Sequence, residues 1–297
     1  MGKPRGDRVD GVLLLDKSGG MTSNLALQKA RRLLNAAKAG HTGTLDPMAT
    51  GLLPLTFGEA TKFSADLLDA DKAYEATIQF GITTTTGDAE GEVIEERPVA
   101  VTGEQLEAAM AQLRGTIDQV PPMYSALKRD GKPLYELARA GIEVERAART
   151  VTIHRFELIE FHGTVARVAV DCSKGTYIRV LAEDLGRLLG CGAHLTALRR
   201  TRVGELTLDG AVTLDALTEM PLEERRAPLA PADRLLASLA RADLDETLAA
   251  RLRQGQRLAI ECPERGRIRV YGPNQELLGT ALVNERGVLA PERLIAS

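Results

Sequence analysis

The stretch Ala39–Leu55, AGHTGTLDPMATGLLPL, lies between apolar segments and has the spacing of neither a helix nor a strand. Its one acid, Asp46, directly precedes Pro47. Proline fixes its own backbone and pushes the preceding residue toward extended geometry, so a stiff loop aims the Asp46 carboxylate. Flanking threonine hydroxyls can orient it, and Gly43 and Gly51 let a ligand approach the backbone closely. The stretch therefore indicates either an Asp-turn or a loop that presents one carboxylate.

A lone carboxylate has three uses in catalysis, as a nucleophile, a base or a metal ligand. A metal site needs further acids or histidines at fitting spacing, and none cluster around Asp46. We therefore expect no metal here. The residues of the loop alone do not decide between an Asp-turn, a nucleophile and a base.

Outward from this loop, the chain alternates between strand and helix patterns. A buried strand is predicted for GVLLLDK at 11–17, followed by a helix at 24–34 that Ser23 can cap. Alternating runs predict a strand at 72–81 and an antiparallel hairpin from 150–163 and 164–175. Further helices are expected at 60–68, 102–113 and 176–190, and a further strand at 194–206. Long antiparallel strands mixed with helices indicate an α+β fold.

A break in the pattern divides the chain near residue 240. Three prolines between 221 and 231 mark it, and a short helix and short strands with glycine turns follow. That composition fits a small β-barrel module of about 55 residues. We therefore predict a large domain at 1–240 and a small domain at 241–297.

Composition places the protein among cytoplasmic proteins. There is no run of 18 apolar residues, and the polar N-terminus lacks the apolar core of a signal peptide. The cysteines are Cys172, Cys191 and Cys262, which lie far apart without CxxC spacing. They indicate reduced thiols and argue against a zinc or disulfide framework.

Charge is distributed unevenly although the net charge is only −3. Residues 86–119 hold eight acids and two basic residues, whereas residues 120–202 hold fourteen Lys or Arg and nine acids. A basic region on an acidic protein suits a polyanion held on one side. Ordinary charge patchiness gives the same counts, so charge alone does not decide.

Three further groups of residues could carry chemistry. Tyr74 lies on a predicted strand, where it fills the core, stacks on a base or serves as a proton acceptor. Tyr177 and Arg179 open a helix, and because the helix dipole disfavours Arg at that end, Arg179 is better explained by an anionic partner. The cluster of Arg199, Arg200 and Arg202 is suited to a phosphate backbone, or is simply a solvated surface.

The order of the motifs is more specific than any one of them. From about Gly11 to Leu206 the sequence resembles the TruB family of tRNA pseudouridine synthases, and the tail from about Arg241 resembles the PUA-type RNA-binding module of bacterial members. The motifs that carry the resemblance are GVLLLDK, GMTSN, GHTGTLDPMATG, KAYEATIQFG, VPPMYSALK, GKPLYELAR, GTYIRVLAEDLG and LRRTRVGE. The tail match rests on layout more than on residues.

The resemblance implies a fold and an activity. It implies a catalytic domain with a central, mostly antiparallel sheet flanked by helices. Such enzymes convert uridine 55 in the T loop of tRNA to pseudouridine, without cofactor or metal. They break the glycosidic bond, turn the base and rejoin C1′ to C5. The nucleotide must be flipped out first, because its reacting atoms are inaccessible in the folded loop.

The resemblance also implies roles at the reacting centre. Asp46 matches the catalytic aspartate, which acts as a nucleophile at the sugar or the base, or as a base at C2′ in a glycal route. Tyr74 matches the tyrosine that stacks on uracil and receives the C5 proton. Tyr177 and Arg179 match the pair beside the aspartate, with Arg179 keeping Asp46 ionised and in place. Leu198 matches a wall of the pocket.

Other residues are implied to contact the RNA around that centre. His41 matches the residue that fills the space left by the flipped nucleotide. Lys17 and Lys62 fall in further family motifs and are expected to contact phosphate. The basic, Gly/Pro-punctuated insertion at 121–150 is expected to clamp the RNA stem-loop.

Two alternatives stay open. One is a catalytically silent tRNA binder on the same scaffold, although a carboxylate facing phosphates weakens polyanion binding. The other is an unrelated aspartate-dependent hydrolase, which lacks a paired acid and base at credible spacing. We expect a monomeric enzyme with tRNA as its partner and no contact with a membrane.

Overall fold

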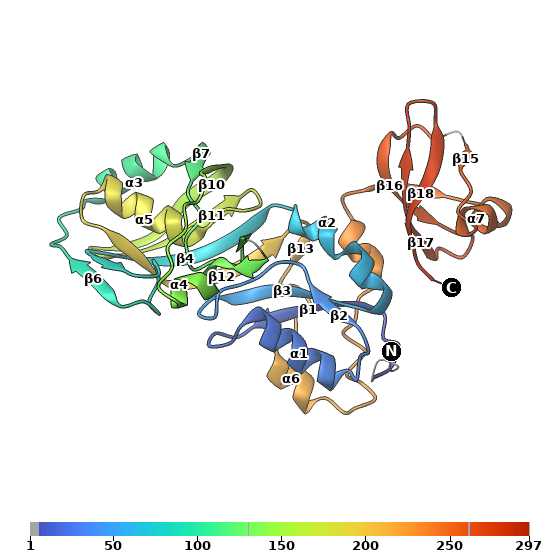
Figure 1. Ribbon diagram of the computed structural model, residues 1–297, viewed down its shortest axis with the longest axis horizontal. Coiled ribbons are helices and arrows are strands. Elements are labelled where there is room, and N and C mark those ends of the chain that lie inside the picture. The colour runs from blue at the N-terminus through green and yellow to red at the C-terminus, as the bar shows by residue number, and fades with distance from the viewer. Residues whose placement is uncertain (1–5, 130, 261, 297) are drawn as a thin grey trace.

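The computed structural model describes residues 6–129, 131–260 and 262–296, and its main feature is one large mixed sheet (Figure 1). Its strands follow the order β1-β3-β12-β4-β11-β10-β7, with β2 on β3 and β13 on β12. All pairs are antiparallel except β3 with β12. The strands are β1 Gly11–Lys17, β2 Ala39–His41, β3 Thr50–Phe57, β4 Lys72–Phe80, β7 Gly115–Gln119, β10 Arg149–His162, β11 Val165–Cys172, β12 Ala193–Val203 and β13 Leu206–Thr207. The predicted α+β fold with a mostly antiparallel sheet is confirmed.

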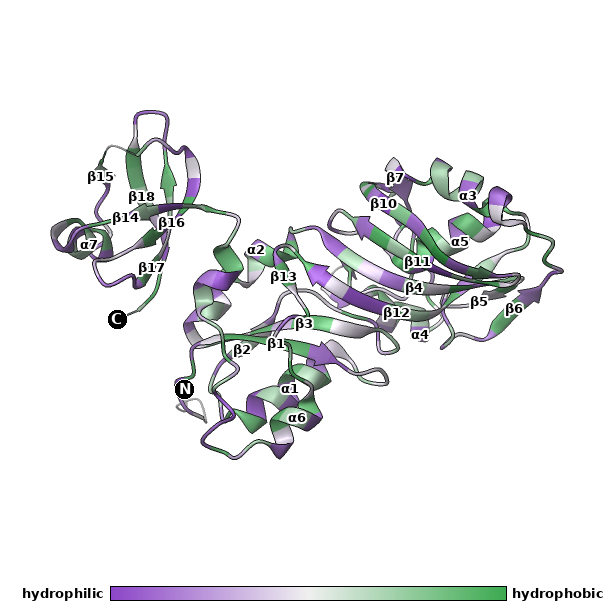
Figure 2. Ribbon diagram, turned by 180° about the vertical axis from the view of Figure 1, so that it is seen from behind, coloured by the Kyte–Doolittle hydropathy of each residue, from purple (hydrophilic) through white to green (hydrophobic). Residues whose placement is uncertain are grey.

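Strand β4 lies in the middle of this sheet and brings distant segments together. It pairs with β11 on one side and with β12 on the other, so that Tyr74 is flanked by Val170 and Arg200. The predicted hairpin of two long alternating runs is confirmed as β10 and β11. Bands of hydrophobic and hydrophilic residues alternate along β4 and β10 in Figure 2, as expected for strands with one buried face.

Helices cover the two ends of the sheet. In Figure 1, α1 and α6 lie beside β1 and β3, whereas α3 and α5 lie beside β10 and β11. The helices are α1 Ser23–Leu33, α2 Ser64–Leu68, α3 Gly103–Gln112, α4 Leu134–Arg139, α5 Ile178–Leu188, α6 Leu214–Glu219 and α7 Glu246–Arg253, with 3₁₀ turns η1 Gly58–Phe63 and η2 Ala232–Leu236. Within the described part of the chain, no helix is both long enough and apolar enough to span a membrane.

Two local predictions needed correction. The expected helix at 60–68 is split into η1 and α2. The cap of α1 is Thr22 and not Ser23, because the Thr22 side chain accepts the Leu25 N–H. Ser23 is buried in the first turn, where its hydroxyl accepts the Leu45 N–H at 2.8 Å and lies 3.1 Å from the Leu45 oxygen. It therefore anchors the aspartate loop instead of capping the helix.

The insertion and the neighbouring loop carry two small hairpins. Strands β8 (Lys128–Arg129) and β9 (Lys132–Pro133) pair within the 121–150 segment, just before α4. Strands β5 (Ile82–Thr84) and β6 (Val93–Glu96) pair beyond the end of β4. These hairpins lie outside the main sheet, and β6 is at the left end of the large domain in Figure 1.

The C-terminal segment forms a second sheet with its own apolar core. The order is β14-β16-β17-β18-β15, which leaves β14 and β15 as edges of a curled sheet. Its strands are β14 Ala240–Asp243, β15 Leu258–Ala259, β16 Gly266–Tyr271, β17 Leu277–Val283 and β18 Val288–Leu294. Contacts with η1 and α2 attach it to the large sheet: Arg267 pairs with Asp66, and the Lys62 ammonium donates to the Leu294 oxygen at 2.7 Å.

The contact between β3 and β12 requires glycine at position 51. The two strands approach so closely there that a Cβ on Gly51 would lie 2.2 Å from the backbone oxygen of Arg200. The φ angle of Gly51 is also +97°, which side chains other than glycine rarely adopt. This glycine therefore sets how the aspartate loop leaves the sheet.

We expect Gly51→Ala to lower the free energy of unfolding by about 2–4 kcal/mol, because the clash is with backbone and the φ angle is strained. Urea denaturation measures the change. Gly103→Ala is the matched control, since that site in α3 is open and the change should stay within about 1 kcal/mol. Equal midpoints for wild type and Gly51→Ala would contradict the close approach.

Candidate active site

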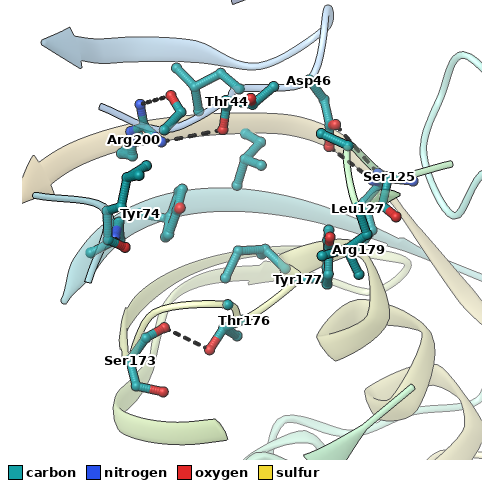
Figure 3. Close-up of a pocket in the computed structure, with 18 of the residues that line it drawn as sticks. Thr44, Asp46, Tyr74, Ser125, Leu127, Ser173, Thr176, Tyr177, Arg179 and Arg200 are labelled. Carbon is teal, nitrogen blue, oxygen red and sulfur yellow. Dashed lines mark hydrogen bonds and ion pairs between the residues drawn. The ribbon is translucent and has the colours of Figure 1, made fainter. Parts of the chain in front are cut away.

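A cavity of about 330 Å³ opens where the Gly43–Asp46 loop, β4, β12, the start of α5 and the tip of the insertion meet. Figure 3 shows Asp46 and Arg179 on one side of this cavity and Tyr74 and Arg200 on the other. The predicted residues that line it are Asp46, Tyr74, Tyr177, Arg179 and Leu198. The fold therefore collects five side chains that are spread over 153 positions of the sequence, from 46 to 198.

Asp46 and Arg179 form an ion pair at this cavity. The Arg179 Nε donates to Asp46 Oδ2 at 2.9 Å, and Nη2 lies 3.3 Å from Oδ1. The Arg179 side chain is 3% exposed and that of Asp46 is 33% exposed, so the carboxylate faces the cavity while its partner is buried. The anionic partner predicted for Arg179 is therefore present, and it is this guanidinium that orients the carboxylate. No hydrogen bond from a neighbouring threonine hydroxyl to Asp46 is found among the described residues.

The remaining partners of Arg179 come from two other loops. Its Nη1 donates to the Thr86 oxygen at 2.7 Å, and its Nη2 donates to the Tyr124 oxygen at 2.6 Å. The carboxylate of Asp88 lies 3.5 Å from Nε and is itself buried. Asp88 also accepts from the Thr86 hydroxyl at 2.5 Å. Charged hydrogen bonds of this kind hold a guanidinium in one orientation.

Sequence reasoning missed Asp88. It lies in the stretch TTTTGDAEG, where two acids between glycines have no visible partner. The signal was present only as an acid in a glycine-punctuated loop, and the sequence does not show that this loop folds against Arg179. The adjacent acid Glu90 accepts the backbone N–H of Met48, and burial raises its pKa.

The turn that carries Asp46 is held in place by Lys17, the last residue of β1. The buried Lys17 ammonium donates to the backbone oxygens of Ser18 at 2.9 Å, Met21 at 2.8 Å and Pro47 at 3.2 Å. Burial lowers the pKa of Lys17 to about 8. All three of its donors are thus used inside the protein, and this geometry makes Lys17 a brace of the loop. A phosphate contact by Lys17 stays a prediction.

Tyr74 and Arg200 form the opposite wall. They are directly paired across β4 and β12, and Arg200 is 1% exposed. The Arg200 guanidinium donates to the oxygens of Leu52, Gly43 and Thr44 at 2.8–3.4 Å. The idea that Arg200 belongs to a surface strip for a phosphate backbone was wrong, because β12 turns this side chain inward.

Tyr177 is placed at the N-terminus of α5. Gln119 in β7 holds its backbone from both sides, accepting the Tyr177 N–H at 3.0 Å and donating to the Tyr177 oxygen at 3.4 Å. The Arg149 guanidinium lies 4.7 Å from the centre of the Tyr177 ring, a cation–π contact. The ring is therefore fixed at the edge of the cavity beside the first turn that carries Arg179.

Leu198 lines the cavity from β12 and is buried. His41 and Lys62 are placed elsewhere. His41 is half-buried in β2, where burial lowers its pKa and the Gly43 N–H lies 3.4 Å from its Nδ1. The Lys62 ammonium contacts Glu59 and the C-terminal sheet. Their expected contacts with RNA stay predictions.

The chemistry available at the cavity is that of a carboxylate beside an aromatic wall. No group of three His, Cys, Asp or Glu that could hold a metal occurs within residues 6–129, 131–260 and 262–296. A partly exposed carboxylate that an arginine holds in place can attack carbon or accept a proton. Tyr74, Tyr177 and Leu198 offer flat and apolar surfaces for a planar ring.

The fold of this chain is shared with solved structures. The chain is similar to one in the crystal structure of a Cbf5-Nop10-Gar1 complex, with a TM-score of 0.75 and 26% identity over 96% of this chain and 84% of that one. A chain from an H/ACA RNP bound to a substrate RNA containing 2′-deoxyuridine shares the fold, with a TM-score of 0.76 and 23% identity over 100% and 92% of the two chains.

The chain belongs to the TruB family of pseudouridylate synthases. The N-terminal domain of that family matches residues 31–178, and two TruB C-terminal domains match residues 179–237 and 240–295. The tRNA pseudouridine synthase B of Aromatoleum aromaticum is 64% identical over 97% of this chain and 94% of its own length. The protein of the same name from Burkholderia mallei is 58% identical, over 97% and 98%.

We expect Asp88→Asn to slow pseudouridine formation at least about tenfold, because it removes the second negative charge that fixes the Arg179 guanidinium beside Asp46. Single-turnover rates on tRNA transcript measure this, with tRNA affinity expected to be largely kept. Asp184→Asn on α5 is the control, since it loses only an exposed contact to Arg187 and should stay within about twofold. Equal rates for Asp88→Asn and the control would show that Arg179 does not need Asp88.

Proposed function

We propose that this protein isomerises uridine 55 in the T loop of tRNA to pseudouridine, without a cofactor. The observation that carries the proposal is the Asp46–Arg179 ion pair in a cavity walled by Tyr74, Tyr177 and Leu198. The relatives named tRNA pseudouridine synthase B support tRNA as the substrate class. The T loop and the position within it follow from the motif resemblance.

The cavity suits a base that has left its stack. Reaching Asp46 requires the uridine to flip out of the folded T loop, which costs a few kcal/mol. Stacking on an aromatic side chain contributes about 1–3 kcal/mol per base, so Tyr74 offsets part of that cost. Leu198 limits the other side of the ring, and His41 is proposed to fill the place that the nucleotide leaves.

The proposed reaction breaks the bond between N1 and C1′, turns the uracil and joins C1′ to C5. Asp46 is proposed to assist either as a nucleophile at the sugar or base, or as a base at C2′ in a glycal route. Each route needs a carboxylate that is ionised, accessible and fixed in direction. The contacts of Arg179 supply the fixed direction in each case. Tyr74 is proposed to accept the C5 proton.

We further propose that residues 1–240 form the catalytic domain and residues 241–297 a PUA-like RNA-binding domain. The separate apolar core of the C-terminal sheet supports this division. The enzyme is proposed to act as a monomer in the cytoplasm. Lys17 and Lys62 are the least supported RNA contacts, because their ammonium groups already donate inside the protein.

A silent tRNA binder on this scaffold is disfavoured by the accessible carboxylate. Binding alone does not need an acid in a cavity that must accept a polyanion, and the acid weakens such binding. The contacts of Arg179 with Asp46 orient a carboxylate for catalysis, and they serve no evident purpose in holding tRNA.

We expect Asp46→Asn to abolish tritium release from tRNA labelled at uridine C5, because the amide can neither attack nor accept a proton. The assay uses unmodified transcript in buffer without added metal. Affinity for tRNA, measured by filter binding, should be kept within about threefold or increase slightly, since one negative charge is lost. Tight binding by the wild-type protein without tritium release would favour the silent binder.

We expect tRNA to protect residues 121–150 from hydrogen exchange. The insertion is proposed to clamp the stem-loop, and its tip already contributes Ser125, Ala126 and Leu127 to the cavity wall. Exchange is measured by mass spectrometry with and without tRNA, and α3 on the far end of the sheet serves as the internal reference. Protection equal to that of α3 would count against the clamp.

A further inference from the structure

Arg200 is a buried cation for which no ion pair with an acid is found in the described part of the chain. Its guanidinium lies at the wall of the cavity and is 1% exposed as a residue. Three of the five donors of a guanidinium go to the backbone oxygens of Leu52, Gly43 and Thr44, which leaves two. Burying a charge without a counter-charge is costly. If position 200 served only to donate hydrogen bonds to backbone carbonyls, a neutral donor would do so without the cost of burying a charge.

The residue paired with Arg200 across the neighbouring strand is Tyr74. The two residues are direct cross-strand partners, and side chains at such positions lie on the same face of the sheet, about 5 Å apart at Cβ. Both residues line the same cavity. Figure 3 shows both residues on the wall opposite Asp46.

The other charged or titratable groups around Tyr74 do not supply positive charge to its hydroxyl in this way. Cys172 faces it from β11 and Asp46 from the loop, and both add negative charge if ionised. Lys72 on the same strand donates its ammonium protons to the backbone oxygens of Leu67, Leu68 and Ala70. Burial raises the pKa of the Tyr74 phenol, and the positive charge of Arg200 acts in the opposite direction.

We propose that Arg200 is a positioning residue that acts through Tyr74, as the counter-ion of the phenolate that accepts the C5 proton. The inference rests on the proposed function, because it assigns a partner to the proton acceptor of that reaction. It explains why β12 directs an arginine into the protein at this position and not into solvent.

The proton transfer balances without a further reactant. After C1′ has joined C5, the C5–H bond breaks and its electron pair forms the C5–C6 double bond. The electron pair of the former C6–N1 double bond moves to N1, and the C5 proton goes to the Tyr74 oxygen. N1 takes one proton from solvent and the phenol returns one to solvent, so no proton is gained or lost. During this step Arg200 keeps its charge, while the group beside it changes from phenolate to phenol.

The experiment varies position 200 and position 74 together. Arg200→Gln is made in three backgrounds: wild type, Tyr74→Phe, and protein with a ring-fluorinated tyrosine at 74, whose phenol ionises more readily. Single-turnover tritium release from tRNA labelled at uridine C5 is measured at saturating enzyme. The two-residue comparison isolates the interaction between the sites.

We expect Arg200→Gln to slow the wild-type reaction by at least about tenfold. The loss should shrink to about threefold or less with fluorotyrosine, and to about twofold or less with phenylalanine, because Arg200 then has no phenolate to stabilise. A merely structural role gives the same fold loss in all three backgrounds. That outcome, or a wild-type rate for Arg200→Gln, overturns the inference.

The matched control is Arg199→Gln, on the opposite face of β12, where Arg199 pairs with Asp16 at 2.7 Å. The fold loss in rate caused by Arg199→Gln, whatever its size, should be the same in the three backgrounds. Thermal unfolding checks that each variant is folded. If Arg200→Gln does not fold, Arg200→Lys is used instead. Because lysine keeps the positive charge and loses the fork that donates to three carbonyls, the inference then expects a loss of about threefold or less, and a loss of about tenfold or more overturns it. An inactive wild-type protein would refute the proposed function itself, whereas active protein with equal losses refutes only the role of Arg200.

Discussion

The site depends on the guanidinium of Arg179, which is shared between two carboxylates and two backbone oxygens from different loops. Asp46, Asp88, Thr86 and Tyr124 each contact it, and none of the four is near it in sequence. A buried ion pair contributes little net stability, because desolvation offsets the attraction between the charges. In this site the ion pair instead fixes the orientation of the Asp46 carboxylate. A carboxylate that must reach one atom of a flipped nucleotide needs a single orientation, and two parallel contacts from a rigid fork provide it.

A second buried arginine holds the other end of the same loop. Arg200 joins the Gly43–Thr44 backbone to β3, while Arg179 holds Asp46 two residues further on. The two cations differ in their charge balance: Arg179 lies between two acids, whereas no acid pairs with Arg200 in the described part of the chain and its cross-strand partner is a tyrosine. One end of the loop is therefore held by an arginine whose charge is balanced by acids, and the other end by an arginine without that balance. The second arginine, Arg200, lies on the side of the cavity where the base is proposed to stack.

Much of the fold could be predicted from local pattern. The alternation of 150–175 predicted the hairpin of β10 and β11 because side chains on a half-buried strand repeat every two residues. The helix expected at 102–113 is found as α3, and Thr102 and Gln105 form a capping box at its start. Ser23 and Arg200 were misassigned for the opposite reason. A serine before a helix and an arginine in a basic cluster have common local uses, and only contacts from distant segments, Leu45 for one and β3 for the other, show that these residues face inward.

The sequence by itself predicted five of the residues that line the cavity, because the motif GHTGTLDPMATG and the order of the motifs around it resemble one family. It also determined that Asp46 lies in a stiff loop and that Arg179 needs an anion, since proline geometry and the helix dipole are local effects. Only the tertiary structure decided that Asp88 shares Arg179, that Lys17 braces the Asp46 turn and that Arg200 faces Tyr74. Each of these contacts joins segments 29 to 126 positions apart, counted from 17 to 46, 88 to 179 and 74 to 200. Such contacts follow from strand order and register, which no local pattern in this chain specifies.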